Sequence, residues 1–420
     1  MKKLSFIVGI MLVFFSCTKL EVRPYIEDDK KEDNGSNDNG SNNNGGNDIN
    51  ISSYYDIPDY IKGVDLSYIN QIEDKGGVYK EDGEVVDPYE LFGRKGANVV
   101  RIRVWHNPIW HKSSNVYGEN SELYSYGDDI KKSIRRAKEN GMAVLLDFHY
   151  SDTWADPGKQ IVPEAWKNIT SMAVLEDSIY NYTYKVMDEL LSEDLLPEMV
   201  QVGNETNCGM MITNTNSGFP SLNTCNGEWA NMGKAVNSAI SAIRDIDKKS
   251  GKKTTIALHV ADPKNLDRWL GDAIKNGKIT DFEIMGVSFY HIWHTQVSFA
   301  NLPTVIKTAK KNHNKEIVIM ETAYPFTSSG NDSYNNIYYD QDVVEDFAYT
   351  VAGQYEFMKK LNENMVDAGA KGVFYWEPAW ISSNLKDEWG QGSSWENCAF
   401  FDFSGEVTSA IDYLTIDYLK

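Results

Sequence analysis

Short apolar segments recur along the chain, and amphipathic segments separate them. Eight are predicted to be β-strands, at residues 61–68, 98–105, 143–150, 199–205, 254–259, 284–290, 317–321 and 372–376. Because these segments are apolar at nearly every position, they are typical of parallel strands buried on both faces. Residues 129–138 have the amphipathic spacing of a covering helix, with a stop at Gly141. The pattern therefore predicts the α/β class, as a (β/α)8 TIM barrel formed by a single domain over residues 56–420.

The first 55 residues have a different character. Two lysines precede an apolar run at 4–15, which is too short to span a bilayer as a helix and is typical of a secretory signal. The run ends at Cys17 in a sequence that resembles a bacterial lipobox, although Phe15 is bulkier than the residue usual there. Residues 1–17 are therefore interpreted as a lipoprotein signal peptide lipidated at Cys17; the alternative is an ordinary signal cleaved elsewhere.

Residues 18–55 are acidic and then rich in Asn, Gly and Ser, so they are predicted to be a flexible tether. Together with the signal, this tether predicts an exported bacterial lipoprotein, held to the outer membrane and facing the cell surface. The remaining cysteines are Cys208, Cys225 and Cys398. An exported chain could pair two of them, and Cys208 and Cys225 lie in one loop by sequence. A domain of this size does not need a disulfide, however, so we expect free or weakly paired thiols.

The charge and the aromatic content narrow the choice of ligand. Lys and Arg number 41 against 61 Asp and Glu, a net charge of −20, which disfavours binding to nucleic acid. A neutral polysaccharide tolerates this charge. The 11 Trp and 24 Tyr agree with sugar binding, since sugar rings present flat C–H faces to aromatic rings, although core packing also explains most aromatic residues.

Polar residues occupy the last positions of six predicted strands, where (β/α)8 barrels carry their active sites. Glycosidic bonds need two carboxyl groups, one to protonate the leaving oxygen and one to attack the anomeric carbon or activate water. Glu205 and Glu321 end two of these strands and fit this requirement. Because the two strands face one another across the barrel mouth, we expect their carboxyls to lie at the roughly 5–5.5 Å spacing of a retaining enzyme. The alternative for each is a structural ion pair with Arg101 or Arg103. His149 could bind a metal rather than a sugar, and Trp376 could belong to the core.

Several motifs are similar to those of glycoside hydrolase family 53, the endo-β-1,4-galactanases, within the clan of retaining barrel glycosidases. The resemblance runs from about Ile61 to the C-terminus and is carried by these stretches: Gly63-Val64-Asp65-Leu66-Ser67, Arg101-Ile102-Arg103-Val104-Trp105, Asp147-Phe148-His149-Tyr150-Ser151-Asp152-Thr153-Trp154-Ala155-Asp156-Pro157, Val200-Gln201-Val202-Gly203-Asn204-Glu205-Thr206-Asn207 and Gly372-Val373-Phe374-Tyr375-Trp376-Glu377-Pro378-Ala379-Trp380. The Asn-Glu pair specifies only the clan, whereas the third and fifth stretches are specific to the family.

The resemblance implies a role for each matching residue. Glu205 corresponds to the general acid/base and Glu321 to the nucleophile. Asn204 would bind the 2-hydroxyl of the reacting sugar, while Arg101 and Tyr290 would hold the nucleophile. Residues that would bind substrate are Asp65, His149, Asp152, Trp154, Trp293, His294, Trp376 and Trp380.

The resemblance also implies endo-hydrolysis of β-1,4-galactan and type I arabinogalactan with retention, releasing galacto-oligosaccharides, by a monomer that needs no cofactor for the chemistry. Some bacterial members carry a structural calcium, and residues 330–336 here are rich in oxygen ligands but short and without a histidine. Two alternatives stay open: another β-glycanase of the clan, acting on mannan or glucan, and a non-catalytic surface glycan-binding lipoprotein.

Overall fold

A computed structural model describes residues 54–339, 343–344 and 346–420. The predicted signal peptide and nearly all of the predicted tether lie outside the described residues. Among the helices of the described residues, none is both long and apolar enough to cross a membrane.

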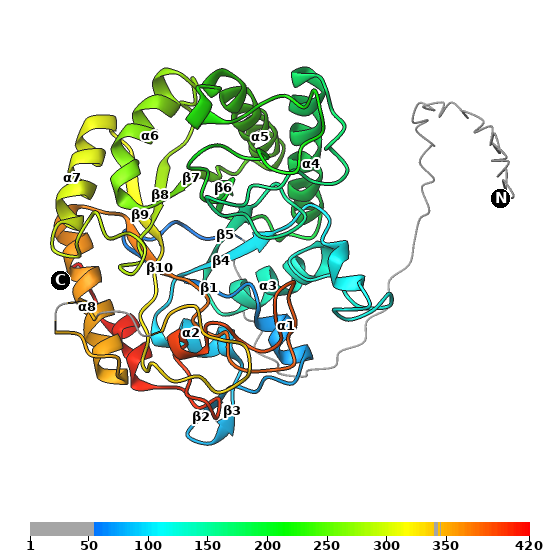
Figure 1. The fold of residues 1–420 in the computed structure, drawn as a ribbon. Coiled ribbons are helices and arrows are strands. Elements are labelled where there is room, and N and C mark those ends of the chain that lie inside the picture. The colour runs from blue at the N-terminus through cyan, green and yellow to red at the C-terminus, as the bar shows by residue number, and fades with distance from the viewer. Residues whose placement is uncertain (1–53, 340–342, 345) are drawn as a thin grey trace, which may run out of the picture. The chain divides into compact units, whose positions relative to one another are not determined.

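Eight parallel strands close into a barrel, as predicted (Figure 1). The strands are β1 (Ile61–Asp65), β4 (Val99–Val104), β5 (Ala143–Phe148), β6 (Met199–Val202), β7 (Thr255–Ala261), β8 (Ile284–Ser288), β9 (Glu316–Glu321) and β10 (Gly372–Tyr375). Each lies beside its neighbour in the chain, and β10 closes the barrel against β1. Most of the predicted strands end earlier than expected, β1 at Asp65 and β6 at Val202, where Gly203 leaves the extended conformation with φ 81°, whereas β7 continues to Ala261.

Helices surround the barrel (Figure 1). They are α1 (Ile69–Asp74), α2 (Pro88–Lys95), α3 (Gly127–Glu139), α4 (Met172–Ser192), α5 (Trp229–Ser250), α6 (Pro263–Lys275), α7 (Leu302–His313) and α8 (Val351–Ala368), and a short hairpin of β2 (Lys80–Glu81) and β3 (Glu84–Val85) precedes α2. The helix predicted at 129–138 is α3, which buries Ile130, Ile134 and Ala137. Gly141 follows it with φ 73°, a left-handed conformation that suits glycine and stops the helix.

The inside of the barrel has two chemically different layers. The lower layer is apolar and contains Ile61, Val99, Ala143, Leu145, Met199, Ala257, Ile284, Val318, Met320 and Phe374. Gly63 makes room for the Phe374 ring, since a Cβ at this position would lie 2.2 Å from that ring. Toward the carboxyl ends of the strands, the inward positions become polar. The apolar layer therefore supports a polar floor at one end of the barrel.

A β-bulge between β8 and β9 sets the direction of Glu321. Val287 pairs with Ile319, but the next residue, Ser288, pairs with Glu321, so Met320 is the extra residue. Met320 packs in the apolar layer. Without the bulge, the residue after an inward Met320 would point to the outer face, because strand side chains alternate. The bulge therefore returns Glu321 to the inside of the barrel.

One expectation about the cysteines was wrong. Cys208 and Cys225 form a disulfide within the connection between β6 and α5. The backbone N–H of Thr224 donates to the Cys208 carbonyl at 2.9 Å, which brings the two ends of this loop together. The barrel needs no covalent link, but this connection is a long excursion with little regular structure, and the disulfide closes it. Cys398 is free and buried.

Candidate active site

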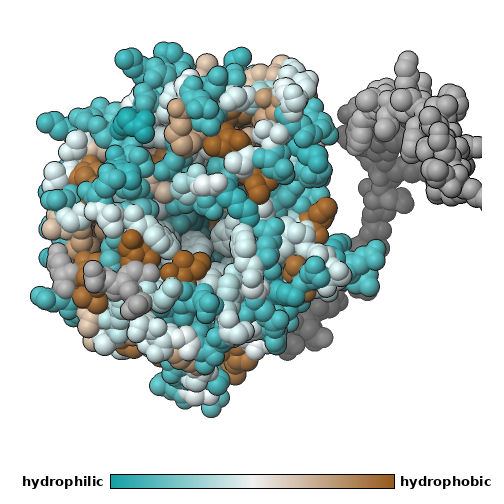
Figure 2. All heavy atoms as spheres, in the orientation of Figure 1, coloured by the Kyte–Doolittle hydropathy of each residue, from teal (hydrophilic) through white to brown (hydrophobic). Residues whose placement is uncertain are grey.

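A cleft of about 660 Å³ opens at the carboxyl ends of the strands. Figure 2 shows the hollow near the centre of this face, with hydrophobic residues at its rim. Its walls come from the segments that follow the strands, and most of them are aromatic or acidic. The lining residues are Trp154, Ala155, Asp156, Pro157, Asn204, Glu205, Ala261, Tyr290, Trp293, His294, Glu321, Tyr334, Ile337, Trp376, Trp380, Asp387, Trp389, Ser394 and Trp395.

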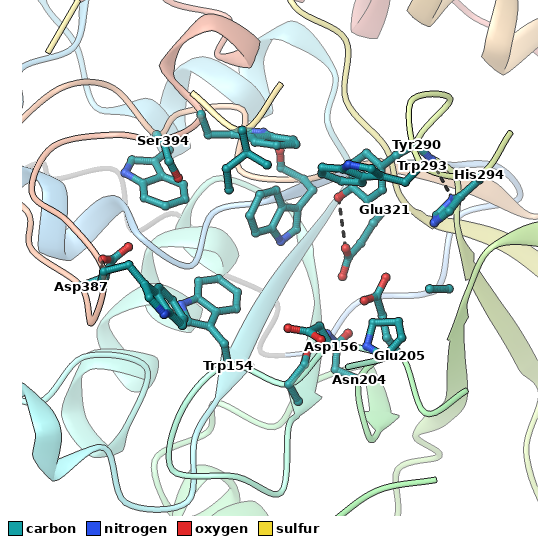
Figure 3. Close-up of a pocket in the computed structure, with 18 of the residues that line it drawn as sticks. Trp154, Asp156, Asn204, Glu205, Tyr290, Trp293, His294, Glu321, Asp387 and Ser394 are labelled. Atoms are coloured by element: carbon teal, nitrogen blue, oxygen red, sulfur yellow. Dashed lines mark hydrogen bonds between the residues drawn. The ribbon is translucent and has the colours of Figure 1, made fainter. Parts of the chain in front are cut away.

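Glu205 and Glu321 face one another across the bottom of this cleft (Figure 3). Carboxylate oxygens of the two residues lie within 4.8 Å of one another. Glu321 ends β9, whereas Glu205 follows β6 with φ 47°, a left-handed conformation that is rare for residues other than glycine. Such backbone strain is concentrated at functional sites, where the surrounding structure holds it in place. The spacing is close to the roughly 5–5.5 Å of a retaining pair and shorter than the separation that an inverting pair needs.

Arg101 on β4 organises the polar floor. Its Nη1 lies 2.8 Å from Glu321 Oε1 and 3.0 Å from Asp65 Oδ2, and its Nη2 lies 2.8 Å from Asp147 Oδ2. The same Nη2 donates to Asn204 Oδ1 at 2.7 Å. A buried guanidinium with three carboxylates is stable only as a fully formed network, because each charge compensates the others.

Glu321 is bound on both oxygens, since the hydroxyl of Tyr290 donates to its Oε2 at 3.1 Å (Figure 3). The pKa of Glu321 is raised to about 7, because burial and the charges of Asp65 and Asp147 together outweigh the opposing charge of Arg101. Burial and the neighbouring Glu321 charge raise the pKa of Glu205 well above its usual range. Of the two carboxyl groups, Glu205 therefore keeps its proton to higher pH, and Glu321 ionises first.

Asn204 is held beside Glu205 by hydrogen bonds of its side chain and of its backbone. Its Nδ2 donates to the Ala155 carbonyl at 2.8 Å, and Gln160 Nε2 donates to its backbone carbonyl at 2.7 Å. Because an amide nitrogen carries two hydrogens, Nδ2 retains one donor for a ligand in the cleft.

Aromatic rings form one wall of the cleft. Trp376 makes edge contacts with Trp154 and Trp395, with centroids 5.8 and 4.8 Å apart, and Trp293 lies parallel to Trp395 at 6.3 Å. Trp293 is about half exposed. Flat apolar surfaces of this kind match the C–H faces of successive sugar rings.

Trp154 owes its position to a buried ion pair. The guanidinium of Arg103 lies between the rings of Trp154 and Tyr68, 4.0 Å from each centroid. Its Nη1 is 2.7 Å from Glu377 Oε1, and Glu377 follows Trp376 with φ 47°. Arg103 and Glu377 thus fix two of the tryptophans that line the cleft.

Most of the residues predicted for the site are brought together. Glu205, Glu321, Asn204, Tyr290, Trp154, Trp293, His294, Trp376 and Trp380 line the cleft, and Arg101 lies directly beneath it. Three residues predicted to bind substrate are placed elsewhere: Asp65, His149 and Asp152.

Asp65 is buried in the ion pair with Arg101 and in a hydrogen bond from Ser67. His149 is also below the cleft: its Nδ1 accepts from Trp105 Nε1 and from the Ala155 N–H, both at 3.2 Å. These two residues shape the floor rather than line the cleft.

Asp152 lies to the side, where one carboxylate oxygen is 3.2 Å from His106 Nδ1 and the other accepts from the Glu164 N–H at 2.8 Å. Its position four residues past the end of β5 did not determine which way its side chain points. It stabilises the loop after β5.

Other lining residues were not predicted from sequence. Tyr334, Asp387, Trp389 and Trp395 come from the long segments after β9 and β10, where no periodic pattern indicates orientation. His259 and Ser288 lie on the floor and contact each other at 2.9 Å. They did carry a signal, because each is a polar residue at an inward position of an otherwise apolar strand.

Glu205, His259 and Glu321 are close enough together to suggest a metal site. The guanidinium of Arg101, 2.8 Å from Glu321, would repel a cation there, so the arrangement fits an acid–base pair better. In segment 330–336 the two carboxylate oxygens of Asp332 accept from the N–H groups of Tyr334 and Ser393, whereas the buried Oδ1 of Asn336 has no hydrogen-bond partner. These contacts do not provide the six to eight oxygen ligands that calcium prefers.

Comparison with known proteins agrees with this geometry. Residues 61–414 match the model of glycosyl hydrolase family 53. The chain is 40% identical to an arabinogalactan endo-β-1,4-galactanase of Cellvibrio japonicus over 82% of this chain and 87% of that protein. It is 30% identical to an endo-β-1,4-galactanase of Bacillus subtilis, over 83% of each.

Among solved structures, the fold is similar to the family 53 catalytic domain of Ignisphaera aggregans, with a TM-score of 0.74 and 30% identity over 87% of this chain and 99% of that one. A structure of fungal β-1,4-galactanases gives a TM-score of 0.68, also at 30% identity, over 85% of this chain and 99% of that one. The chain therefore belongs to glycosyl hydrolase family 53.

Proposed function

We propose that this protein is an endo-β-1,4-galactanase that hydrolyses internal bonds of galactan and type I arabinogalactan with retention of configuration. Family membership supports glycoside hydrolysis, and the galactanase relatives from Cellvibrio japonicus and Bacillus subtilis support galactan as the substrate. The observation that carries the mechanism is the Glu205–Glu321 pair, with oxygens within 4.8 Å and different surroundings. Other members of the wider clan act on mannan or glucan, and a polysaccharide panel separates these substrates.

In the first step, the ionised Glu321 attacks the anomeric carbon while Glu205 gives its proton to the departing glycosidic oxygen. The C–O bond breaks, and a covalent galactosyl-enzyme forms on Glu321. Loss of the Glu321 charge then lowers the pKa of Glu205, because the carboxylate that repelled its ionisation has become an ester.

In the second step, Glu205 takes a proton from a water molecule, and the hydroxide equivalent attacks the same carbon and frees Glu321. Two inversions give net retention. Asn204 donates to the 2-hydroxyl of the reacting sugar, a contact that strengthens as positive charge develops on the ring. Arg101 and Tyr290 hold the nucleophile and stabilise it again as it departs.

Replacement of each glutamate, with azide present, tests the two roles. Glu205→Ala should transfer the galactobiosyl group of an activated aryl β-galactobioside to Glu321 with release of the phenolate, and azide should then displace Glu321 to give the β-azide. Glu321→Ala should give the α-azide, because azide attacks directly in place of the missing nucleophile. Both variants should lose at least about a thousandfold in reducing-sugar release from galactan. Full activity of Glu321→Ala on galactan, or wild-type binding without turnover, would exclude the proposal.

We further propose that the protein is an exported, monomeric lipoprotein, anchored through Cys17 to the outer membrane and facing outward. The lipobox-like sequence at Phe14-Phe15-Ser16-Cys17 and the acidic, Asn/Gly/Ser-rich tether support this. Labelled palmitate should be incorporated into the wild type and not into Cys17→Ser. Protease added to intact cells should release the galactanase domain; protection from protease would contradict the surface location, and a dimer by light scattering would contradict the monomer.

A further inference from the structure

A chain of buried polar groups runs behind Glu205, and its hydrogens can be assigned from its contacts. It begins at Asn204 Oδ1, which accepts from Arg101 Nη2 at 2.7 Å and from Gln201 Nε2 at 3.1 Å. A guanidinium nitrogen donates and cannot accept, so the Asn204 atom facing Arg101 must be the amide oxygen. The orientation of this amide is thereby fixed.

The next member is His259 on β7, which is fully buried. Its Nδ1 lies 2.8 Å from Asn204 Oδ1, and its Nε2 lies 2.9 Å from Ser288 Oγ. Because an amide oxygen only accepts, Nδ1 must carry the hydrogen. Burial and the nearby Arg101 charge hold the pKa of His259 well below its usual range, so the ring is neutral and its Nε2 is bare.

This assignment determines the hydrogen of Ser288 on β8. The bare Nε2 of His259 can only accept, so the Ser288 hydroxyl donates to it. Ser288 Oγ also lies 2.6 Å from Glu205 Oε1. Since a hydroxyl has one hydrogen, this second contact requires a proton on Glu205. The chain therefore runs Glu205–H to Ser288, Ser288–H to His259 and His259–H to Asn204.

An ionised Glu205 would break this order. Ser288 would have to turn its hydrogen to the carboxylate, which leaves two lone pairs facing each other between Ser288 and His259. A change of tautomer at His259 would only move the conflict to Asn204. Either arrangement loses a short buried hydrogen bond, and the change of tautomer regains only the longer contact of 3.4 Å from the Glu205 N–H to His259 Nδ1.

Charged and titratable groups face Glu205 from several elements. Glu321 from β9 and Asp156 after β5 disfavour its ionisation, and Arg101 from β4 favours it. A hydrogen donated by Ser288 would also favour ionisation and lower the pKa of Glu205, but the order of hydrogens above turns it to His259. Tyr290 and His294 come from the segment after β8 and are neutral, because burial raises the pKa of Tyr290 and lowers that of His294 to about 4. The hydrogen-bond order acts in addition to these charges.

We propose, on the basis of the proposed function, that Ser288 and His259 are positioning residues that keep Glu205 in its proton-donating form before each turnover. The arrangement also returns the proton after the second step, because the order of hydrogens is complete only when Glu205 is protonated again. The ligand side of Glu205 is left free for the glycosidic oxygen.

The basic limb of the pH profile of kcat/KM tests this proposal, because it reports ionisation of the acid in the free enzyme. Ser288→Ala and His259→Phe should each move this limb to lower pH by about one unit, the size expected for one buried hydrogen bond. Ser288→Thr, which keeps the hydroxyl, should restore it. The matched control Ser241→Ala removes an exposed hydroxyl on α5 and should leave the profile unchanged.

The sign of the shift separates the two directions of the Ser288 bond. If Ser288 simply donates to an ionised Glu205, Ser288→Ala should move the basic limb to higher pH, and that result or an unmoved limb would overturn the proposal. Nitrogen-15 NMR, with the His259 signal identified by its loss in His259→Phe, should show the neutral Nδ1–H tautomer. An Nε2–H tautomer would overturn the proposal, and this measurement does not depend on enzyme activity. Absence of turnover on galactan would instead refute only the proposed function.

Discussion

Arg101 and Glu321 are joined through a contact of 2.8 Å in which the arginine serves three carboxylates at once. The nucleophile therefore shares its counter-charge with Asp65 and Asp147, neither of which reaches the cleft. Because Arg101 is shared, it only partly opposes the effect of burial, and the pKa of Glu321 is raised to about 7. The sharing also makes the activity depend on groups below the floor.

Replacement of Arg101 by lysine should reduce kcat/KM about a hundredfold, because an ammonium group cannot reach all of the guanidinium's partners. Arg101 lowers the pKa of Glu321, so its loss should raise that pKa. Since only the ionised Glu321 attacks, the acidic limb of kcat/KM should move from about pH 7 to higher pH. Arg135→Lys, on the surface, is the control. A folded Arg101→Lys enzyme with an unmoved acidic limb would contradict this account.

Arg103 and Glu377 should affect substrate binding more than chemistry. Arg103→Met removes the group that holds Trp154 in place and should raise KM about tenfold with a smaller change in kcat. Trp154→Ala should raise KM similarly, and the two changes should be less than additive in the double variant. Arg268→Met, at an exposed position of α6, is the control. Full additivity would show that Arg103 does not act through Trp154.

The disulfide should contribute to stability although the barrel closes without it. Cys208 and Cys225 are 17 residues apart, so replacing both by serine should lower the free energy of unfolding by about 3 kcal/mol. Denaturant unfolding measures this loss. Reducing agent should lower the Tm of the wild type and leave that of the double variant unchanged; equal sensitivity of both would locate the effect elsewhere.

Calcium should not stabilise the loop at 330–336, because both oxygens of its one carboxylate, Asp332, already accept from backbone N–H groups. Adding a chelator to the purified protein should therefore leave its Tm unchanged. Metal analysis provides an independent measurement. A fall in Tm that calcium reverses would show that these side chains rearrange around an ion.

The sequence predicted the barrel well because its strands are marked by burial on both faces, which leaves nearly unbroken apolar segments. Glu205 and Glu321 were found for a related reason: a carboxylate directly after such a segment must lie at the mouth of the barrel. Strand position is therefore a reliable guide to the floor of the site.

Side chains beyond the strand ends were harder to predict. Asp152 follows β5 by a few residues, yet its carboxylate turns to His106, because loop direction depends on contacts that no local pattern contains. Trp389 and Trp395 reach the cleft from a segment without periodicity. The disulfide between Cys208 and Cys225 was not expected, although the two residues lie in one loop by sequence. Domain size indicates only whether the fold needs a disulfide, and it does not indicate whether two cysteines of one loop come into contact.

The bulge at Met320 limits which changes in the sequence of β9 evolution can accept. A regular β9 of the same length would place Met320 opposite Ser288 and turn Glu321 toward the helices, so substitutions that straighten this strand should be purged by selection. The segments after β9 and β10 have no such constraint and can lengthen or shorten. Divergence in this lineage should therefore accumulate in the walls of the cleft, altering which branched polymers are accepted while the bond-breaking centre is inherited intact.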